Sequence, residues 1–335
     1  MFVLHLFSGF RRQGDLQWCL EQALVVTPTR LHVISIDIAH DPTWGDLTDD
    51  ATVAVWLDLL RSGRVAAIVA GPPCESWSAA RHIPAPQSRR PPRPLRSLEH
   101  LWGLGHVNGR ERQQLDIGNQ LLRTTIRFLH IAWIYGVPAI MEHPAQCTWR
   151  EGVPSSWQLP SLRRLAAQPG VKAHLVHQCA FGGRAKKPTT LLAVHMQAMQ
   201  RWLDAKRGGG LCLGDHPHRS LQGLDADGLW VSAQAKTYPQ GLCVFLAATI
   251  LEEVRTRFPC IRSETPLRFN VNPLLHAPSF DWSDSQDCVL CRRLGIDAVE
   301  DEWDIPWGLR RYFAPMDPYV ASGITMDCMI HQRRD

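Results

Sequence analysis

The chain has 335 residues, of which 45% are hydrophobic and 20% charged, and its formal net charge is +4, which is ordinary for a soluble globular protein with one large domain or a domain and an appendage. No apolar run approaches the ~20 residues of a membrane span, and the N-terminus lacks the basic start and cleavage site of a signal peptide. The ten cysteines are scattered, as reduced thiols usually are, so we expect a nuclear or cytoplasmic protein that is not secreted and has no membrane partner.

Short apolar runs alternate with stretches of helical periodicity along the first 258 residues. In chain order, strands are expected at residues 2–7, 32–37, 65–70, 138–143, 174–179 and 189–194. Helices are expected after Gly14-Asp15 and at 52–60, 113–134 and 241–258, the last of them amphipathic. The last two strands are predicted to form an antiparallel pair. This alternation predicts an α/β fold with a mostly parallel sheet and helices on both faces.

Charge is distributed unevenly along the chain. Residues 76–98 and 152–203 contain basic residues and no acid, which fits either a surface that faces a polyanion or a solvated basic face without a partner. The proline- and arginine-rich stretch 84–96 is expected to be a mobile flap or binding arm. The candidate nucleic-acid-binding residues are Arg81, Arg89, Arg90, Arg93, Arg96 and Lys186.

Acidic residues dominate from 281 to 304, which places a boundary near residue 260. We therefore expect a main domain over 1–258 and a C-terminal appendage over 259–335 that is metal-binding or poorly ordered. A CxxC pair and a CxxH pair in the appendage match the ligands of a tetrahedral zinc site, although two unrelated pairs fit as well. These candidate ligands are Cys288, Cys291, Cys328 and His331.

Cys74 is the first candidate for chemistry. The run 65–70 suits a buried strand, and Gly71-Pro72-Pro73 ends it because proline cannot donate to a ladder. The thiol is therefore expected just past a strand's carboxyl end, the edge where open parallel sheets bind ligands.

Other strand ends carry residues that suit a nucleoside. Phe7-Ser8-Gly9 follows the first strand as a glycine turn, which lets backbone approach a cofactor. Asp37 ends the second strand, where an acid can bind ribose hydroxyls, and Gly45-Asp46 follows. Each feature alone also fits a turn or a helix cap. In this order they predict a nucleoside cofactor pocket.

The ordered segments LHLFSG, SIDI, GDLTDD, VAGPPCESWS and MEHP resemble the DNA (cytosine-5)-methyltransferase family. The later segments HQCAFGGRAKKPTTLL, CLGDHPHRSLQG and KTYPQGL look like those of short members from phages and mobile elements such as retroelements. The resemblance covers roughly residues 3–250. It implies a Rossmann-like S-adenosylmethionine-dependent methyltransferase fold and DNA as the partner.

The resemblance also implies roles for individual residues. Cys74 would add to C6 of cytosine, Glu142 would bind the N3 and amino group of the base, and Arg184 or Lys187 would steady the loop and the substrate. Cofactor binding would fall to a set of residues at the strand ends, namely Phe7, Ser8, Gly9, Asp15, Asp37, Ile38, Asp46 and Pro72. Nearby cations are expected to lower the pKa of the Cys74 thiol, and burial to keep Glu142 protonated.

The chain departs from the family pattern at four places. Glu75 replaces a glutamine after the catalytic Pro-Cys, His143-Pro144 follows Glu142 in place of Asn-Val, and Tyr238-Pro239-Gln240 stands where a late Gly-Asn element is usual. The region left for target recognition is short, at about residues 195–214. Methylation of cytosine in RNA, or a catalytically silent nucleic-acid-binding module of a mobile element, therefore stay open as alternatives.

Overall fold

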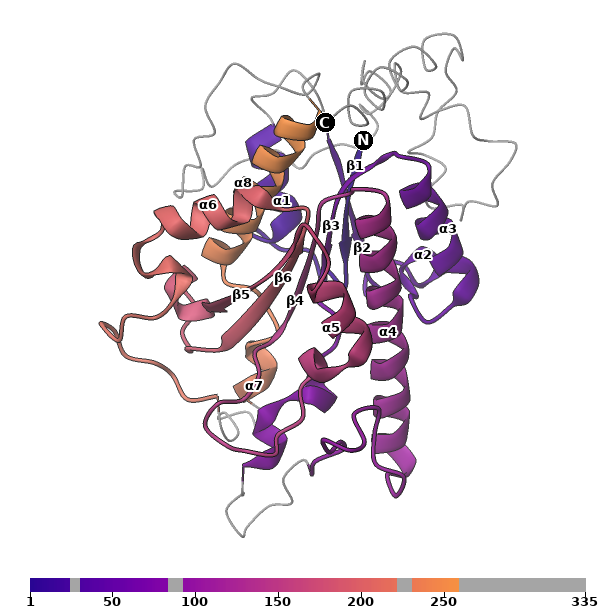
Figure 1. Ribbon diagram of the computed structural model, residues 1–335, viewed down its shortest axis with the longest axis vertical. Helices are drawn as coiled ribbons and strands as arrows, with labels where there is room; N and C mark the ends of the chain where they lie inside the picture. Colours follow the sequence, from indigo (N-terminus) through magenta and orange to yellow (C-terminus); the bar gives the residue numbers. More distant parts are fainter. Residues whose placement is uncertain (25–30, 84–92, 222–230, 259–335) are drawn as a thin grey trace.

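The part of the chain that the structure describes folds around a six-stranded sheet (Figure 1). The computed structural model describes residues 1–24, 31–83, 93–221 and 231–258. The strands are β1 (Phe2–Leu6), β2 (His32–Ile36), β3 (Val65–Ala70), β4 (Ala139–Pro144), β5 (Val171–His177) and β6 (Pro188–Val194). Their order is β2-β1-β3-β4-β6-β5. Strand β6 runs antiparallel to both of its neighbours, β4 and β5, and the other neighbouring pairs are parallel. The expected mostly parallel, Rossmann-like α/β fold is confirmed.

Helices cover both faces of this sheet (Figure 1). They are α1 (Leu16–Leu24), α2 (Pro42–Gly45), α3 (Asp50–Arg61), α4 (Gly109–Ile134), α5 (Pro160–Ala166), α6 (Gln197–Ala205), α7 (Val231–Gln234) and α8 (Gln240–Arg257). Helices α1 and α6 pack against α8 on one side, while α3 and α5 pack against α4 on the other. No helix in the described ranges has the length and apolar character needed to cross a membrane.

The core follows from the composition of the central strands. Every residue of β1 and β3 is buried, as expected for parallel strands that are covered on both faces. Helix α3 is capped at its N-terminus by Asp49, whose side chain accepts a hydrogen bond from the Thr52 backbone N–H. On the same helix, the buried Trp56 donates its indole N–H to the Trp44 carbonyl at 2.9 Å, which joins α2 to α3.

Two sequence predictions differ from the structure. Helix α8 is buried along most of its length rather than amphipathic, because it lies between the sheet and two other helices, α1 and α6. Strand β5 begins at Val171 and ends at His177, so Cys179 belongs to the short 3-10 helix η4 (Gln178–Phe181) instead of the strand. The ladder between β5 and β6 ends at His177 opposite Pro188, and this pairing sets the end of the strand.

The strand order creates a switch point between β1 and β3. The chain moves from β1 outward to β2 and then returns to the other side of β1 at β3. In open parallel sheets, ligands bind outside the carboxyl ends of the strands at such a point. The turn after β1, Asp37 after β2 and Cys74 after β3 all lie at this edge.

Three of the buried histidines in the strands, His5, His143 and His174, make stability depend on pH. Burial lowers the pKa of His143 to about 3, and the pKa values of His5 and His174 to about 4. Below pH 6.5 these imidazoles bind protons in the unfolded chain but stay neutral in the folded one. The free energy of unfolding should therefore fall as the pH drops from 6.5 toward 4.

We expect His143→Gln to make this fall shallower, by at most about 1.4 kcal/mol per pH unit. The measurement is urea unfolding at pH 4 to 8. His100→Gln, at an exposed position, is the matched control and should leave the slope unchanged. An unchanged slope in His143→Gln would show that this imidazole is protonated in the folded state.

Candidate active site

Cys74 lies on a loop at the carboxyl end of β3, where its sequence context predicts it. The strand ends at Ala70, and Cys74 immediately precedes the 3-10 helix η1 (Glu75–Trp77). The thiol is free and the residue partly exposed. A cysteine in this position can meet a ligand at the sheet edge.

Glu142 lies near the end of β4, the strand that pairs with β3. Ala70 pairs with Met141, so Glu142 is level with Gly71, the first residue after β3. A Cβ built on Gly71 would lie 3.8 Å from Glu142 Oε2. Glu142 is also among the charges that act on the Cys74 thiol. The structure therefore brings Cys74 and Glu142 to the same edge of the sheet.

Three polar side chains hold the Glu142 carboxylate, which is 5% exposed. Lys187 Nζ lies 3.5 Å from Oε1, Gln178 Nε2 donates to Oε1 at 3.3 Å, and the Tyr238 hydroxyl donates to Oε2 at 3.2 Å. A buried carboxylate requires such partners, because an unpaired one would carry the full cost of lost hydration. Lys187, rather than the exposed Arg184, is the predicted cation that reaches Glu142.

The environment of Cys74 overturns one expectation. Burial raises the pKa of the Cys74 thiol to about 11; Lys187 opposes this shift and Glu142 adds to it. The expected lowering is wrong for the protein alone, because the loss of hydration outweighs the nearby cations. A bound substrate would have to lower the pKa of the Cys74 thiol for the thiolate to form.

Two of the arginines expected to bind nucleic acid support the Cys74 loop instead. Arg96 is 2% exposed, its guanidinium carbon lies 3.7 Å from the centre of the Trp77 ring, and Nη2 donates to Ser76 Oγ at 2.8 Å. Arg81 donates to the Glu75 carbonyl at 2.7 Å and to Gln114 Oε1 at 2.8 Å. The prediction is corrected for Arg96, which is enclosed by protein. The guanidinium of Arg81 is likewise held by protein acceptors.

The remaining basic candidates are divided between the surface and the undescribed ranges. Lys186 is exposed, and Arg93 is exposed but forms an ion pair with Glu111 at 2.6 Å. Arg89 and Arg90 lie outside the described residues, as do the zinc candidates Cys288, Cys291, Cys328 and His331 and the appendage 259–335. Their roles stay predictions.

The turn after β1 is held against the end of β2 by Asp37. The Gly9 backbone N–H donates to Asp37 Oδ2 and the Ala39 N–H to Oδ1, both at 2.8 Å. Phe7 opens this turn with φ +61°, a left-handed conformation that costs a bulky residue about 1–3 kcal/mol and is concentrated at functional sites. The sheet edge is therefore shaped by strained backbone that the Asp37 carboxylate stabilises.

Two of the other predicted cofactor residues suit a nucleoside. Ile38, 60% exposed, offers an apolar surface beside Asp37. Asp46 is brought to the same place by Gly45, where a Cβ would lie 2.2 Å from the Asp37 carbonyl oxygen. Asp46 Oδ1 accepts two hydrogen bonds from Thr48. Ser8 is partly exposed and Pro72 is buried.

Asp15 does not line this surface. It is 7% exposed, and its carboxylate accepts from the backbone N–H groups of Arg12 and Trp18 and from the Arg11 guanidinium. Although burial alone would raise it, these hydrogen bonds hold the pKa of Asp15 below its usual value. Asp15 caps helix α1, which corrects its assignment to cofactor binding.

The residues after β1 and β2 fit the nucleoside part of S-adenosylmethionine. Each Asp37 oxygen accepts one N–H and retains a lone pair for a ribose hydroxyl, which is a donor. The exposed Ile38 can contact the face of an adenine ring, which is apolar. The fit rests on the free lone pairs of Asp37 and on the apolar surface of Ile38.

Three residues around the site were not assigned roles from sequence. Gln178 and Tyr238 donate to Glu142, and Lys236 forms an ion pair with Glu75. The departure at Glu75 is thereby neutralised. Tyr238 and Lys236 belong to the segment KTYPQGL, which the resemblance highlighted without naming their partners. Gln178 belongs to another such segment, HQCAFGGRAKKPTTLL, which likewise did not indicate its contact with Glu142.

His143, which departs from the family pattern, is a packing residue. It is 1% exposed, and its Nδ1 is 2.7 Å from Ser156 Oγ. Its ring makes edge contacts with Trp77 and Trp157. His143 therefore supports the loop after β3 from beneath.

Comparisons with known proteins give only weak likenesses. No protein-family model and no curated protein matches the chain. Among solved structures, the chain is similar to the Dnmt2 methyltransferase of S. pombe, with a TM-score of 0.30 and 12% identity over 59% of this chain and 52% of that one. It is also similar to the Entamoeba histolytica methyltransferase EhMeth, with a TM-score of 0.33 and 9% identity over 76% of this chain and 98% of that one.

The match therefore spans about half the length of the S. pombe protein. Because both TM-scores lie below 0.5, the Rossmann-like fold is established by the order and direction of the strands, and function is inferred from the site residues.

The contact between Gly71 and Tyr238 can be tested by substitution. A Cβ on Gly71 would lie 2.4 Å from the Tyr238 hydroxyl oxygen. Gly71→Ala should reduce the free energy of unfolding by about 1–3 kcal/mol, the usual cost of overpacking. Tyr238→Phe in the same chain should recover part of the loss, because it removes the clashing oxygen.

Denaturant unfolding measures both variants. Gly105→Ala, where no atom lies within 4 Å of a Cβ, is the control. Equal stability of Gly71→Ala and Gly105→Ala would contradict the close packing of Tyr238.

The raised pKa of Cys74 can be read from its reactivity. Alkylation by iodoacetamide should increase with pH up to an apparent pKa near 11. Lys187→Met should raise this pKa further and slow alkylation at pH 8 by about threefold or more, because the opposing cation is lost. Mass spectrometry of the Cys74 peptide gives the rate. Lys186→Met is the neighbouring control, and an equal effect of both variants would show that Lys187 has no special place beside the thiol.

Proposed function

We propose that the chain is an S-adenosylmethionine-dependent methyltransferase that acts on C5 of cytosine in DNA through a covalent Cys74 adduct at C6. The observation that carries this proposal is the convergence of Cys74 and Glu142 at neighbouring strand ends. The resemblance of the flanking motifs to the cytosine-5 family gives the reaction. The Rossmann-like sheet provides an edge of the kind that binds nucleosides.

Each site residue has a role in this mechanism. The Cys74 thiolate forms a bond to C6, which places negative charge on the ring and makes C5 a nucleophile. Glu142, in its protonated form, would donate to N3 of the base and accept from its amino group, and Lys187, Gln178 and Tyr238 would keep its carboxyl group in place. S-adenosylmethionine, when bound, supplies the methyl group. Loss of the C5 proton and of the Cys74 thiolate from C6 then restores the aromatic ring.

Cofactor binding is assigned to the turn after β1 and to the end of β2. Asp37 would hold the ribose hydroxyls, Ile38 would contact the adenine ring, and Asp46 would face its amino group. Phe7, Ser8, Gly9 and Pro72 would form the surrounding wall. The free lone pairs of Asp37 and the exposed apolar side chain of Ile38 support this assignment.

The substrate base must leave the duplex to reach Cys74, which costs a few kcal/mol. The exposed Lys186 and Arg184 can contact phosphates and offset part of this cost. Half of the short region 195–214 is taken up by helix α6, which packs on α8. Few residues of this region are left to recognise a target sequence, so we expect limited sequence specificity. RNA is the alternative substrate for the same chemistry.

A catalytically silent nucleic-acid-binding module is the second candidate. Two observations favour it: burial raises the pKa of Cys74 to about 11, and the Glu142 carboxylate is already held by three donors. When a base binds, the pKa of Cys74 would have to fall and Glu142 would have to exchange a protein donor for the base. Activity therefore depends on whether substrate displaces Tyr238 or Gln178.

Methyl transfer and adduct formation separate these candidates. The protein is incubated with methyl-labelled S-adenosylmethionine and either duplex DNA or tRNA. Label on DNA is expected, label on tRNA alone would transfer the proposal to RNA, and absence of both label and cofactor binding would identify the silent module.

A DNA that contains 5-fluorocytosine should trap a covalent complex, because fluorine at C5 cannot leave as a proton does. Cys74→Ser should abolish the complex, while Cys147→Ser, at a partly exposed thiol outside the site, should retain it. A complex that persists in Cys74→Ser would reject the nucleophile assignment.

A further inference from the structure

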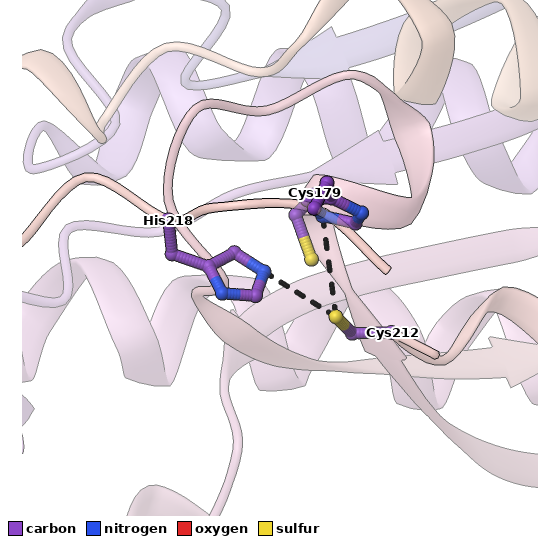
Figure 2. A group of neighbouring side chains, drawn as sticks. Cys179, Cys212 and His218 are labelled. Carbon is purple, nitrogen blue, oxygen red and sulfur yellow. Dashed lines mark hydrogen bonds between the residues drawn. The ribbon is translucent and has the colours of Figure 1, made fainter. Parts of the chain in front are cut away.

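Two cysteines and two histidines converge beside the hairpin of β5 and β6, next to Gln178 in the chain. Cys179 belongs to η4, directly after β5. Cys212, His216 and His218 lie in the segment that follows the 3-10 helix η5 (Arg207–Gly210). Figure 2 shows Cys179 and His218 pointing toward the Cys212 sulfur from separate parts of the chain. The four ligand atoms all lie within 4.8 Å of one another.

The spacing of these atoms is close to that of a tetrahedral metal site. Zinc–sulfur bonds of about 2.3 Å and zinc–nitrogen bonds of about 2.0–2.1 Å give tetrahedron edges of roughly 3.3–3.8 Å. His218 Nε2 is 3.3 Å from Cys212 Sγ, and His216 Nε2 is 4.0 Å from it. Small side-chain rotations would close the longest separation, which exceeds a tetrahedron edge by about 1 Å.

The surrounding contacts orient the ligands toward the centre of the cluster. Asp215 Oδ1 lies 2.8 Å from His216 Nδ1. A carboxylate only accepts, so it favours the tautomer with the proton on Nδ1, in which Nε2 can bind a metal ion. A carboxylate behind a ligating histidine is a recurrent arrangement in zinc sites. In addition, the Gly214 N–H donates to Cys212 Sγ at 3.3 Å, which holds the sulfur in position.

The Cys212 backbone is itself fixed in place. Its N–H donates to His177 Nδ1, on the last residue of β5, at 2.9 Å. Further along, the Arg219 N–H donates to the Arg184 carbonyl at 2.8 Å. The segment with three of the ligands is thus already attached to the hairpin that supplies the fourth.

We propose that Cys179, Cys212, His216 and His218 bind one Zn²⁺ ion. Two thiolates and two neutral imidazoles match the preference of zinc for nitrogen and sulfur, and their charges balance the ion. Four protein ligands leave no open position, so the ion is structural. It fixes the segment 207–221 to the end of β5, where the neighbouring Gln178 contacts Glu142.

Metal analysis of the purified full chain tests the site. The parent protein should contain one more zinc per chain than His218→Ala, whose exposed position makes misfolding a poor explanation for a loss. Cys212→Ser should lose the same equivalent. Cys147→Ser is the matched thiol control. Because the appendage has its own CxxC pair, Cys288→Ser/Cys291→Ser must retain the equivalent that His218→Ala loses.

Two further measurements do not depend on zinc content alone. With Co²⁺ in place of Zn²⁺, the parent should show the visible absorption of a tetrahedral thiolate site, and Cys212→Ser should not. Asp215→Asn should weaken metal affinity about 10–100-fold, as expected for loss of the carboxylate behind a ligating histidine.

Three outcomes would overturn the proposal. The first is a parent protein without zinc that does not take up Co²⁺. The second is equal metal content in the parent and in His218→Ala. The third is a Cys179–Cys212 disulfide in the protein purified under reducing conditions. Removal of the ion by a chelator should also speed trypsin cleavage after the exposed Arg207, because the segment 207–221 would unfold locally more often, and an unchanged cleavage rate would contradict the structural role of the ion.

Discussion

The buried Glu142 carboxylate is the interaction on which the geometry of the sheet edge depends. A carboxyl group that is 5% exposed requires hydrogen-bond partners, and they come from separate parts of the chain. Lys187 comes from the turn before β6, Gln178 from η4 and Tyr238 from the segment before α8. Lys187 also donates to the Ala235 carbonyl at 2.8 Å, which joins the residue after α7 to the hairpin. Contacts with one carboxyl group thereby hold these three segments together near Cys74.

A layer of flat side chains supports this edge from beneath. The Arg96 guanidinium stacks on Trp77, and Trp77 and Trp157 contact the His143 ring edge to face. The loop after β3 consequently rests on packed rings, and its backbone is further held by Arg81. Arginine in this chain thus serves packing as well as surface charge, which is why a count of basic residues overstates the surface available to a polyanion.

Much of the fold followed from patterns in the sequence, because buried parallel strands are short apolar runs bounded by turn residues. The central strands, the long helix α4 and the place of Cys74 at a strand end were all predictable in this way. The bounds of β5, the burial of α8 and the zinc-like cluster were not. In each case the deciding contacts join residues far apart in the chain, such as Cys179 with Cys212. Residue preferences carry no information on such pairs.

The sequence by itself determined which residues lie at strand ends, since proline, glycine and aspartate stop strands for local steric and hydrogen-bonding reasons. It therefore placed Cys74, Asp37 and Glu142 correctly along the chain. Only the tertiary structure decided their surroundings. The pKa of Cys74 rises because neighbouring segments exclude water from it, Asp15 turns inward to cap α1, and Arg96 is enclosed by protein. Hydration and packing depend on the whole fold, and no local pattern encodes them.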